Sequence, residues 1–272
     1  WERTVEDFVQ ALDSEPILRQ LKECRHLLVN FSADGALWVD FGSKAESDAG
    51  LPEPKCRLVY DAASIEGQWA EQIRGEVFGF MSCLVAALAV EFVRHHEHAD
   101  TPPDLATALA TGLATMRDLR QLGHGEVGDH HPAGYPVERL ASVLVASPRG
   151  FSQCDVPWTL LLHSGSDARL PWSIAVQSQI APTGEMLPLP MMGLAHQVVQ
   201  RGRRMLSHLP HAQFGGLFTI DRGEIETLRT LRRLMQQYKQ SCRMGDAVCK
   251  PLSIGVFGPP GAGKSFGVKQ IA

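Results

Sequence analysis

Cysteine is scarce in this sequence and shows no metal-binding spacing. The six cysteines stand at positions 24, 56, 83, 154, 242 and 249, and none belongs to a Cys-x-x-Cys pair. This absence argues against a structural zinc site, which commonly draws its ligands from such pairs. Cysteines whose spacing indicates neither disulfide pairs nor a metal site are typical of reduced thiols in the cytoplasm. We therefore expect six free thiols and a cytoplasmic location.

Long hydrophobic runs are also lacking. The longest uncharged apolar stretch covers residues 77–90, between Glu76 and Glu91. A membrane-spanning helix needs about 20 apolar residues, so we interpret this stretch as a buried helix and expect no membrane partner. Acidic residues occur early in the chain, which does not resemble a secretory signal. The chain opens on Trp1 instead of methionine, which fits a fragment.

The chain has no excess of either charge sign. Its 26 Lys and Arg face 30 Asp and Glu, which leaves a net charge of −4. This balance gives no overall electrostatic signal for nucleic acid or for an anionic membrane. The local basic run at residues 201–204 is typical of a solvated helix face.

Strand and helix patterns alternate along the chain and predict an α/β fold. Asp34 and Gly35 separate two strand-like runs at 26–31 and 36–41, which is the composition of a β-hairpin. A further strand is expected at 56–60. Helix patterns cover residues 4–21, with a break near Pro16, and residues 75–94, 105–122, 194–206 and 225–238. The helix at 105–122 has a start signal at 101–104, and the helix at 225–238 has one at 221–224.

The most specific motif is Gly258-Pro-Pro-Gly-Ala-Gly-Lys-Ser265, which matches the P-loop pattern Gly-x-x-x-x-Gly-Lys-Ser/Thr. The apolar run 251–257 predicts a buried strand before the loop, and residues 265–272 predict a helix after it. Glycines in such a loop let backbone N–H groups converge on an anion. Lys264 would then reach the β- and γ-phosphates, and the Ser265 hydroxyl would bind Mg²⁺.

Residues 246–272 resemble the start of an AAA-type or related P-loop ATPase domain. The resemblance implies ATP and Mg²⁺ as cofactors, ATP hydrolysis, and a homo-oligomer formed through the complete domain. Only eight residues follow Lys264, so no catalytic base or arginine is assigned, and we expect a fragment that is inactive alone. The implied nucleotide contacts are Gly258, Pro259, Pro260, Gly261, Ala262, Gly263, Lys264, Ser265 and Phe266.

The first 125 residues resemble the nucleotide-binding half of ribokinase-like carbohydrate kinases, in the segments CRHLLVNFSADGALWV, CRLVYD, GEVFGFMSCLVAALA and ATALATGLATM. In that family an Asp at the start of a long helix takes the proton from the sugar hydroxyl. Aligning that helix on residues 81–88 puts Phe78 at the catalytic position, and phenylalanine accepts no proton. Glu76 stands two positions early. We therefore expect a degenerate lobe.

Three parts follow from these resemblances. We predict an incomplete ribokinase-like lobe at 1–125, a linker and mixed α/β middle region at 126–245, and the first strand, P-loop and helix of a P-loop NTPase domain at 246–272. The arrangement is similar to multidomain bacterial proteins in which a kinase-like region precedes an ATPase, some with a ryanodine-receptor-type repeat.

Two other groups of residues are weaker metal candidates. His95 and His98 share a helix face, but a third ligand is missing, so a solvated helix end explains them. Asp61 and Asp221 each follow a short apolar run, as Mg²⁺-binding acids do in P-loop enzymes. Both precede the loop, whereas the acidic strand of such enzymes mostly follows it.

The sequence favours an ATP-dependent protein with a regulatory or conformational role. Two alternatives stay open. One is a carbohydrate kinase that uses the N-terminal lobe, and the other is a non-catalytic interaction module with vestigial nucleotide sites.

Overall fold

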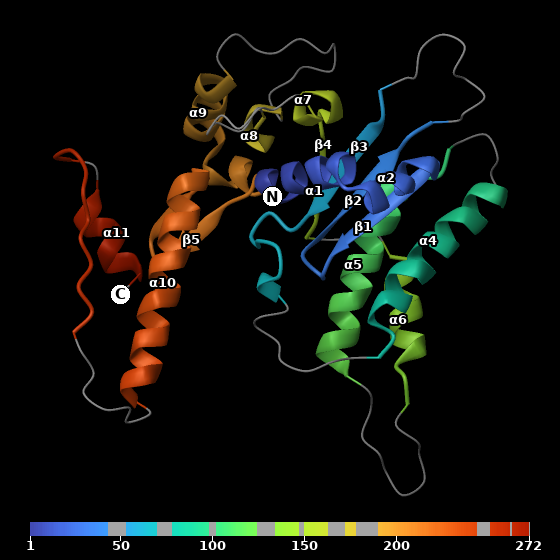
Figure 1. Ribbon diagram of the computed structural model, residues 1–272. Coiled ribbons are helices and arrows are strands. Elements are labelled where there is room, and N and C mark those ends of the chain that lie inside the picture. Colours follow the sequence, from blue (N-terminus) through green and yellow to red (C-terminus); the bar gives the residue numbers. More distant parts are fainter. Residues whose placement is uncertain are drawn as a thin grey trace, which may run out of the picture. The chain divides into compact units, whose positions relative to one another are not determined.

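The computed structural model describes residues 1–42, 53–69, 78–97, 102–123, 134–146, 150–162, 172–177, 190–243, 251–261 and 263–271. The chain divides into two compact units, Trp1–His208 and Leu209–Ala272. Both units contain helices and antiparallel strands, so the fold is mixed α/β (Figure 1).

The first unit is built on a four-stranded antiparallel sheet in the order β1-β2-β3-β4. The predicted hairpin is confirmed, because Phe31 pairs with Gly35 at its turn. Gly35 has no room for a side chain, since a Cβ there would lie 2.8 Å from the carbonyl oxygen of Val59. The strands are β1 (His26–Phe31), β2 (Gly35–Asp40), β3 (Lys55–Tyr60) and β4 (Ser152–Asp155).

Both faces of the central strands are buried. Ala36 of β2 and Val59 of β3 pack in one core with Leu109 and Leu113 of the helix α5 (Leu105–Leu122). Side chains alternate along a strand, so Leu37 and Leu58, which are fully buried, point to the opposite face, over which the helix α1 (Glu2–Ser14) passes (Figure 1).

The helix α5 has the predicted bounds and the predicted start. The side chain of Asp104 accepts a hydrogen bond from the backbone N–H of Thr107, which satisfies a free donor in the first turn. Gly123 follows the last turn with a φ of 65°, a conformation that favours glycine and ends the helix. The prediction for 105–122 is therefore confirmed.

The helix α4 (Phe80–Glu97) corrects the prediction of a fully buried helix. Cys83, Leu84 and Ala87 are buried, and Leu84 packs in the core with α5. Met81 and Val85 on another face are 50% and 61% exposed. An unbroken apolar run shows that a helix contains no charge, but it does not show how many of its faces find a neighbour.

The remaining elements of the first unit are short. The predicted break near Pro16 is confirmed, because Pro16 is the first residue of a separate helix. Leu140 packs in the same core as α5, although it lies beyond the predicted limit at residue 125. These elements are α2 (Pro16–Arg19), α6 (Val137–Leu144), α7 (Trp158–Leu162), α8 (Ile174–Gln177), α9 (Pro190–Arg201) and the 3₁₀ helices Gln20–Glu23 and Arg203–Leu206.

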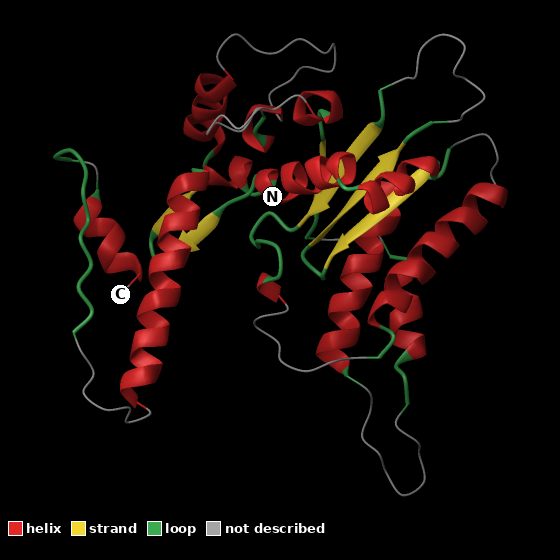
Figure 2. Cartoon of the chain, viewed as in Figure 1, coloured by secondary structure: helices red, strands yellow, loops and turns green. Residues whose placement is uncertain are grey.

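The second unit contains a hairpin of β5 (Ala212–Phe214) and β6 (Leu217–Thr219), followed by the long helix α10 (Arg222–Arg243) and the helix α11 (Lys264–Ile271) (Figure 2). As predicted, Asp221 caps α10, and its carboxylate accepts the backbone N–H of Glu224 at 2.7 Å. A small core joins the three parts through Ala212, Phe214, Leu217, Ile225, Leu228 and Ile271.

The strand predicted at 251–257 is wrong. The structure gives this segment no regular secondary structure (Figure 2). Every residue in it is exposed, with Phe257 at 94%. A strand needs a neighbouring strand to satisfy its backbone N–H and C=O groups. Residues 251–257 pair with no strand among the described residues.

The expectation of six free thiols is wrong. Cys24, Cys56, Cys83 and Cys154 are free, whereas Cys242 is disulfide-bonded. A disulfide requires two cysteines with Cα atoms about 4.4–6.8 Å apart. That condition depends on the folded arrangement, which spacing in the sequence does not reveal. Cys249 lies outside the described residues.

None of the helices in the described ranges has the length and hydropathy that crossing a membrane requires.

Candidate functional site

The candidate site is the loop Gly258–Phe266 at the start of α11. Gly258, Gly261 and Gly263 all have positive φ, at 155°, 81° and 70°. A Cβ at Gly261 or Gly263 would meet nothing within 4 Å. Backbone conformation, not lack of space, therefore requires glycine at these two positions.

Lys264 folds back over this loop. Its ammonium donates hydrogen bonds to the carbonyl oxygens of Gly258, at 2.7 Å, and Pro259, at 2.5 Å. The aliphatic part of the side chain lies beside Gly258, where a Cβ would be 3.4 Å from Cδ of Lys264. The positive charge is thus held at the loop and is not extended into solvent.

The N-terminus of α11 adds backbone donors next to this charge. The N–H of Gly267 bonds to the carbonyl of Gly263, which closes the first turn of the helix. The N–H groups of Lys264, Ser265 and Phe266 precede that bond, so they have no acceptor within the helix. A helix N-terminus of this kind favours an anion.

The two prolines limit which backbone groups can donate. Pro259 and Pro260 have no N–H, so they shape the loop without contacting an anion through the main chain. The side chains of Ser265 and Phe266 are exposed at the start of α11. Ala262, which the sequence also assigns to the nucleotide, lies outside the described residues.

The residues present fit a polyphosphate better than they fit a metal ion alone. Positive φ at three glycines lets the backbone wrap around an anion. One ammonium and the free N–H groups at a helix start carry the positive charge that attracts negative oxygen atoms. Ser265 offers Mg²⁺ one hydroxyl oxygen. No group of three His, Cys, Asp or Glu in the described part of the chain is arranged to hold a metal ion.

Neither acid considered from the sequence lies free for Mg²⁺. Asp221 caps α10 through its carboxylate. Asp61 forms an ion pair with Arg117 of α5, with 2.8 Å between Oδ2 and Nη1. His95 lies in α4, and its proposed partner His98 is outside the described residues.

The position aligned with the kinase catalytic acid carries no proton acceptor. Phe78 is 83% exposed, immediately before α4. Glu76, the neighbouring carboxylate in the sequence, lies outside the described residues.

Sequence reasoning missed a buried ion cluster in the first unit. Asp34 at the β1–β2 turn is completely buried, and its Oδ1 lies 3.5 Å from Nη2 of Arg117. The backbone N–H of Trp69 donates to both carboxylate oxygens of Asp34, at 3.1 and 3.2 Å. Arg117 also donates from Nε to the carbonyl of Ala33 at 2.7 Å.

Burial sets the charge state of this cluster. Desolvation raises the pKa of Asp34 to about 6, although the N–H of Trp69 and the charge of Arg117 act to lower it. The guanidinium of Arg117 also lies 4.7 Å from the centre of the Phe151 ring. Each of these contacts links parts of the first unit to one another, but burial makes the ionised form of Asp34 less favourable in the folded protein than in the unfolded chain.

No protein-family model, curated protein or solved structure matches this chain.

Proposed function

We propose that the loop Gly258–Phe266 binds the polyphosphate of ATP together with Mg²⁺, as part of a cytoplasmic protein that hydrolyses ATP in a regulatory or conformational role. The observation that supports this most is the position of Lys264. Its ammonium lies over a loop whose glycines have positive φ, directly at the start of a helix. One cation and the free N–H groups of a helix start thus belong to the same short loop, which supports a site for phosphate oxygens.

The residues of the loop have separate roles in this proposal. The N–H groups of Gly261, Gly263, Lys264 and Ser265 donate to phosphate oxygens, and Lys264 adds a charge-assisted hydrogen bond. When bound, Mg²⁺ neutralises part of the phosphate charge, and the Ser265 hydroxyl is the group in this loop that would hold it.

Binding must release Lys264 from the two carbonyls that hold it. An ammonium has three N–H donors and no acceptor, and the structure uses two of them for Gly258 and Pro259. Phosphate oxygens carry full negative charge and accept stronger hydrogen bonds than neutral carbonyls. The exchange therefore favours the nucleotide.

Calorimetric titration of the chain with ATP and Mg²⁺ tests this proposal. Lys264→Ala should weaken binding by roughly 10- to 150-fold, because a hydrogen bond to a charged group contributes about 1.5–3 kcal/mol. Lys269→Ala is the matched control, since Lys269 is an exposed lysine later in the same helix. Equal affinities of the two variants would show that the loop does not bind ATP.

A further inference from the structure

The two units carry opposite net charges, which the total for the chain conceals. Residues 209–272 contain nine Lys and Arg against four Asp and Glu, a net charge of +5. Residues 1–208 contain 17 against 26, a net charge of −9. A basic segment of this kind in an acidic chain attracts polyanions.

Much of the positive charge lies on α10. After Glu226 this helix contains no acid, but it contains Arg229, Arg232, Arg233, Lys239 and Arg243. Successive members of the series 229, 232, 236, 239 and 243 are three or four residues apart, so they lie on one side of the helix. Gln236 adds an amide between the cations. We call this side the basic face of α10.

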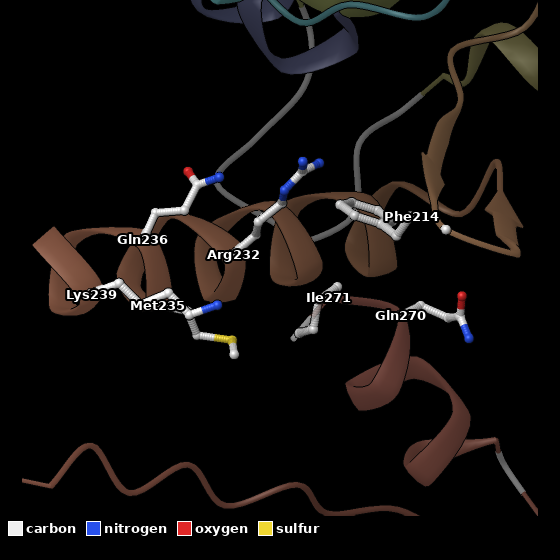
Figure 3. A pocket seen from close by; sticks show the side chains of 8 residues that line it. Phe214, Arg232, Met235, Gln236, Lys239, Gln270 and Ile271 are labelled. Atoms are coloured by element: carbon white, nitrogen blue, oxygen red, sulfur yellow. The ribbon is translucent and has the colours of Figure 1, made fainter.

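The basic face borders a pocket of about 300 Å³. Arg232, Gln236 and Lys239 line it from α10, and Gln270 lines it from α11 (Figure 3). Its polar groups are thus two cations and two side-chain amides. Amides both donate and accept hydrogen bonds, whereas the cations only donate.

Apolar side chains complete the lining of the pocket. Met235 of α10, Phe214 of β5 and Ile271 of α11 line it beside the polar groups (Figure 3). An anion with an apolar body, such as a phosphate attached to a sugar, has both kinds of surface. The pocket is at the small end of the range for ligand sites, so it would hold one such unit.

The row of cations is longer than the pocket, which favours a polymer over a small anion. From Arg229 to Arg243 the basic face spans about 21 Å of helix, whereas the residues of α10 that line the pocket, from Arg232 to Lys239, span about 10 Å. An α-helix also has the width that the major groove of duplex DNA admits. One arginine guanidinium can donate two parallel hydrogen bonds to the oxygens of a phosphate. Glutamine amides bind phosphates and base edges.

We propose that the basic face of α10 binds the phosphate backbone of double-stranded DNA, with one phosphate and its sugar in the pocket of Arg232, Lys239 and Gln270. This site is separate from the ATP loop. Lys264 belongs to the loop at the start of α11, whereas Gln270 and Ile271 of the pocket lie at the end of that helix. The proposal therefore does not depend on ATP binding.

Fluorescence anisotropy with a labelled 20-base-pair DNA duplex, without ATP or Mg²⁺, tests this site in the full chain. The double variant Arg232→Ala, Lys239→Ala should bind roughly tenfold more weakly or worse. The slope of log K against log salt concentration should become about 1.8 less steep, because each phosphate that the protein neutralises adds about 0.9 to it. Arg232 and Lys239 are both exposed, so their replacement should leave the fold intact. Circular dichroism would verify that the variant is folded.

The matched control is Arg203→Ala, Arg204→Ala, which removes two exposed arginines from the 3₁₀ helix of the first unit. It should bind the duplex as the natural protein does. The proposal is overturned if the natural chain does not bind at low salt, or if both double variants lose the same affinity. Equal competition by a glutamate-rich peptide or by single-stranded DNA of matched charge would also overturn it, because each identifies a different partner.

The two proposals fail independently in these experiments. Lys264→Ala should leave duplex binding without nucleotide within about twofold of the natural protein, because Lys264 does not line the pocket. Loss of duplex binding in the pocket variant alone supports the DNA site, whatever the outcome of the ATP titration.

Discussion

The ammonium of Lys264 lies 2.7 Å from the carbonyl oxygen of Gly258, six residues earlier in the chain. This contact places a positive charge against the residue that begins the P-loop pattern. Gly258 has a φ of 155°, and the helix α11 begins at Lys264 itself. The first and seventh residues of the motif are thus brought together by the loop, although the segment that leads into it, residues 251–257, has no regular secondary structure.

The pKa of Asp34 predicts an unusual pH dependence of stability. Burial raises this pKa to about 6 from the ordinary value of 3.8. Between pH 4 and 6 the folded protein therefore holds a proton that the unfolded chain has released. The stabilisation from this group is complete below about pH 4 and is lost as the pH rises through 6. Asp34→Asn should lose more unfolding free energy, relative to the natural protein, at pH 4.5 than at pH 7.

Urea denaturation of both proteins at a series of pH values measures this difference. Asp13→Asn is a control with the opposite sign, because a hydrogen bond from Lys22 at 2.6 Å lowers the pKa of Asp13. Its small contribution is present above about pH 4 and is lost as the pH falls. A difference between Asp34→Asn and the natural protein that stays constant from pH 4.5 to 7 would contradict burial as the dominant cause.

The close approach of α4 and α5 depends on Gly112. A Cβ at this position would lie 2.6 Å from Cδ1 and 2.9 Å from Cα of Leu84. Alanine favours helix by about 1 kcal/mol over glycine, but the two helices would have to separate. We expect Gly112→Ala to lower the unfolding free energy by roughly 1–3 kcal/mol, as measured by urea denaturation.

Gly267 of α11 provides the opposite case for the same substitution. A Cβ there would meet nothing within 4 Å, so only the helix preference remains. Gly267→Ala should increase hydrogen-exchange protection of the α11 amides by roughly two- to fivefold, which corresponds to about 0.5–1 kcal/mol. For the earlier substitution, a Gly112→Ala variant that is more stable than the natural protein would contradict our expectation, because it would show that the packing of α4 on α5 tolerates a methyl group.

Local signals in the sequence predicted most of the regular elements. Asp34-Gly35 marks a turn, Asp104 and Asp221 supply caps, and Gly123 ends a helix, and each signal acts within a few residues. The glycine pattern of the loop belongs to the same class, because the positive φ values are local.

The features that the sequence did not reveal depend on distant residues. Asp34 and Arg117 are 83 positions apart, so a residue interpreted only as part of a turn is also a buried ion partner. Burial of a second face of α4 would need another element to pack against it. A strand at 251–257 would need a neighbouring strand to pair with. The sequence shows that the predicted helix at 225–238 is rich in arginine, but the net charge of +5 becomes visible only when the chain is divided into its two units.

The most direct measurement is nuclear magnetic resonance of the backbone amides of the loop in the ¹⁵N-labelled chain. If these N–H groups hold phosphate oxygens, the amides of Gly261, Gly263, Lys264 and Ser265 should shift with ATP and Mg²⁺. They should shift in the same way with inorganic tripolyphosphate, but not with adenosine. Amides that stay unchanged with ATP, or that shift with adenosine alone, would contradict a phosphate site at this loop.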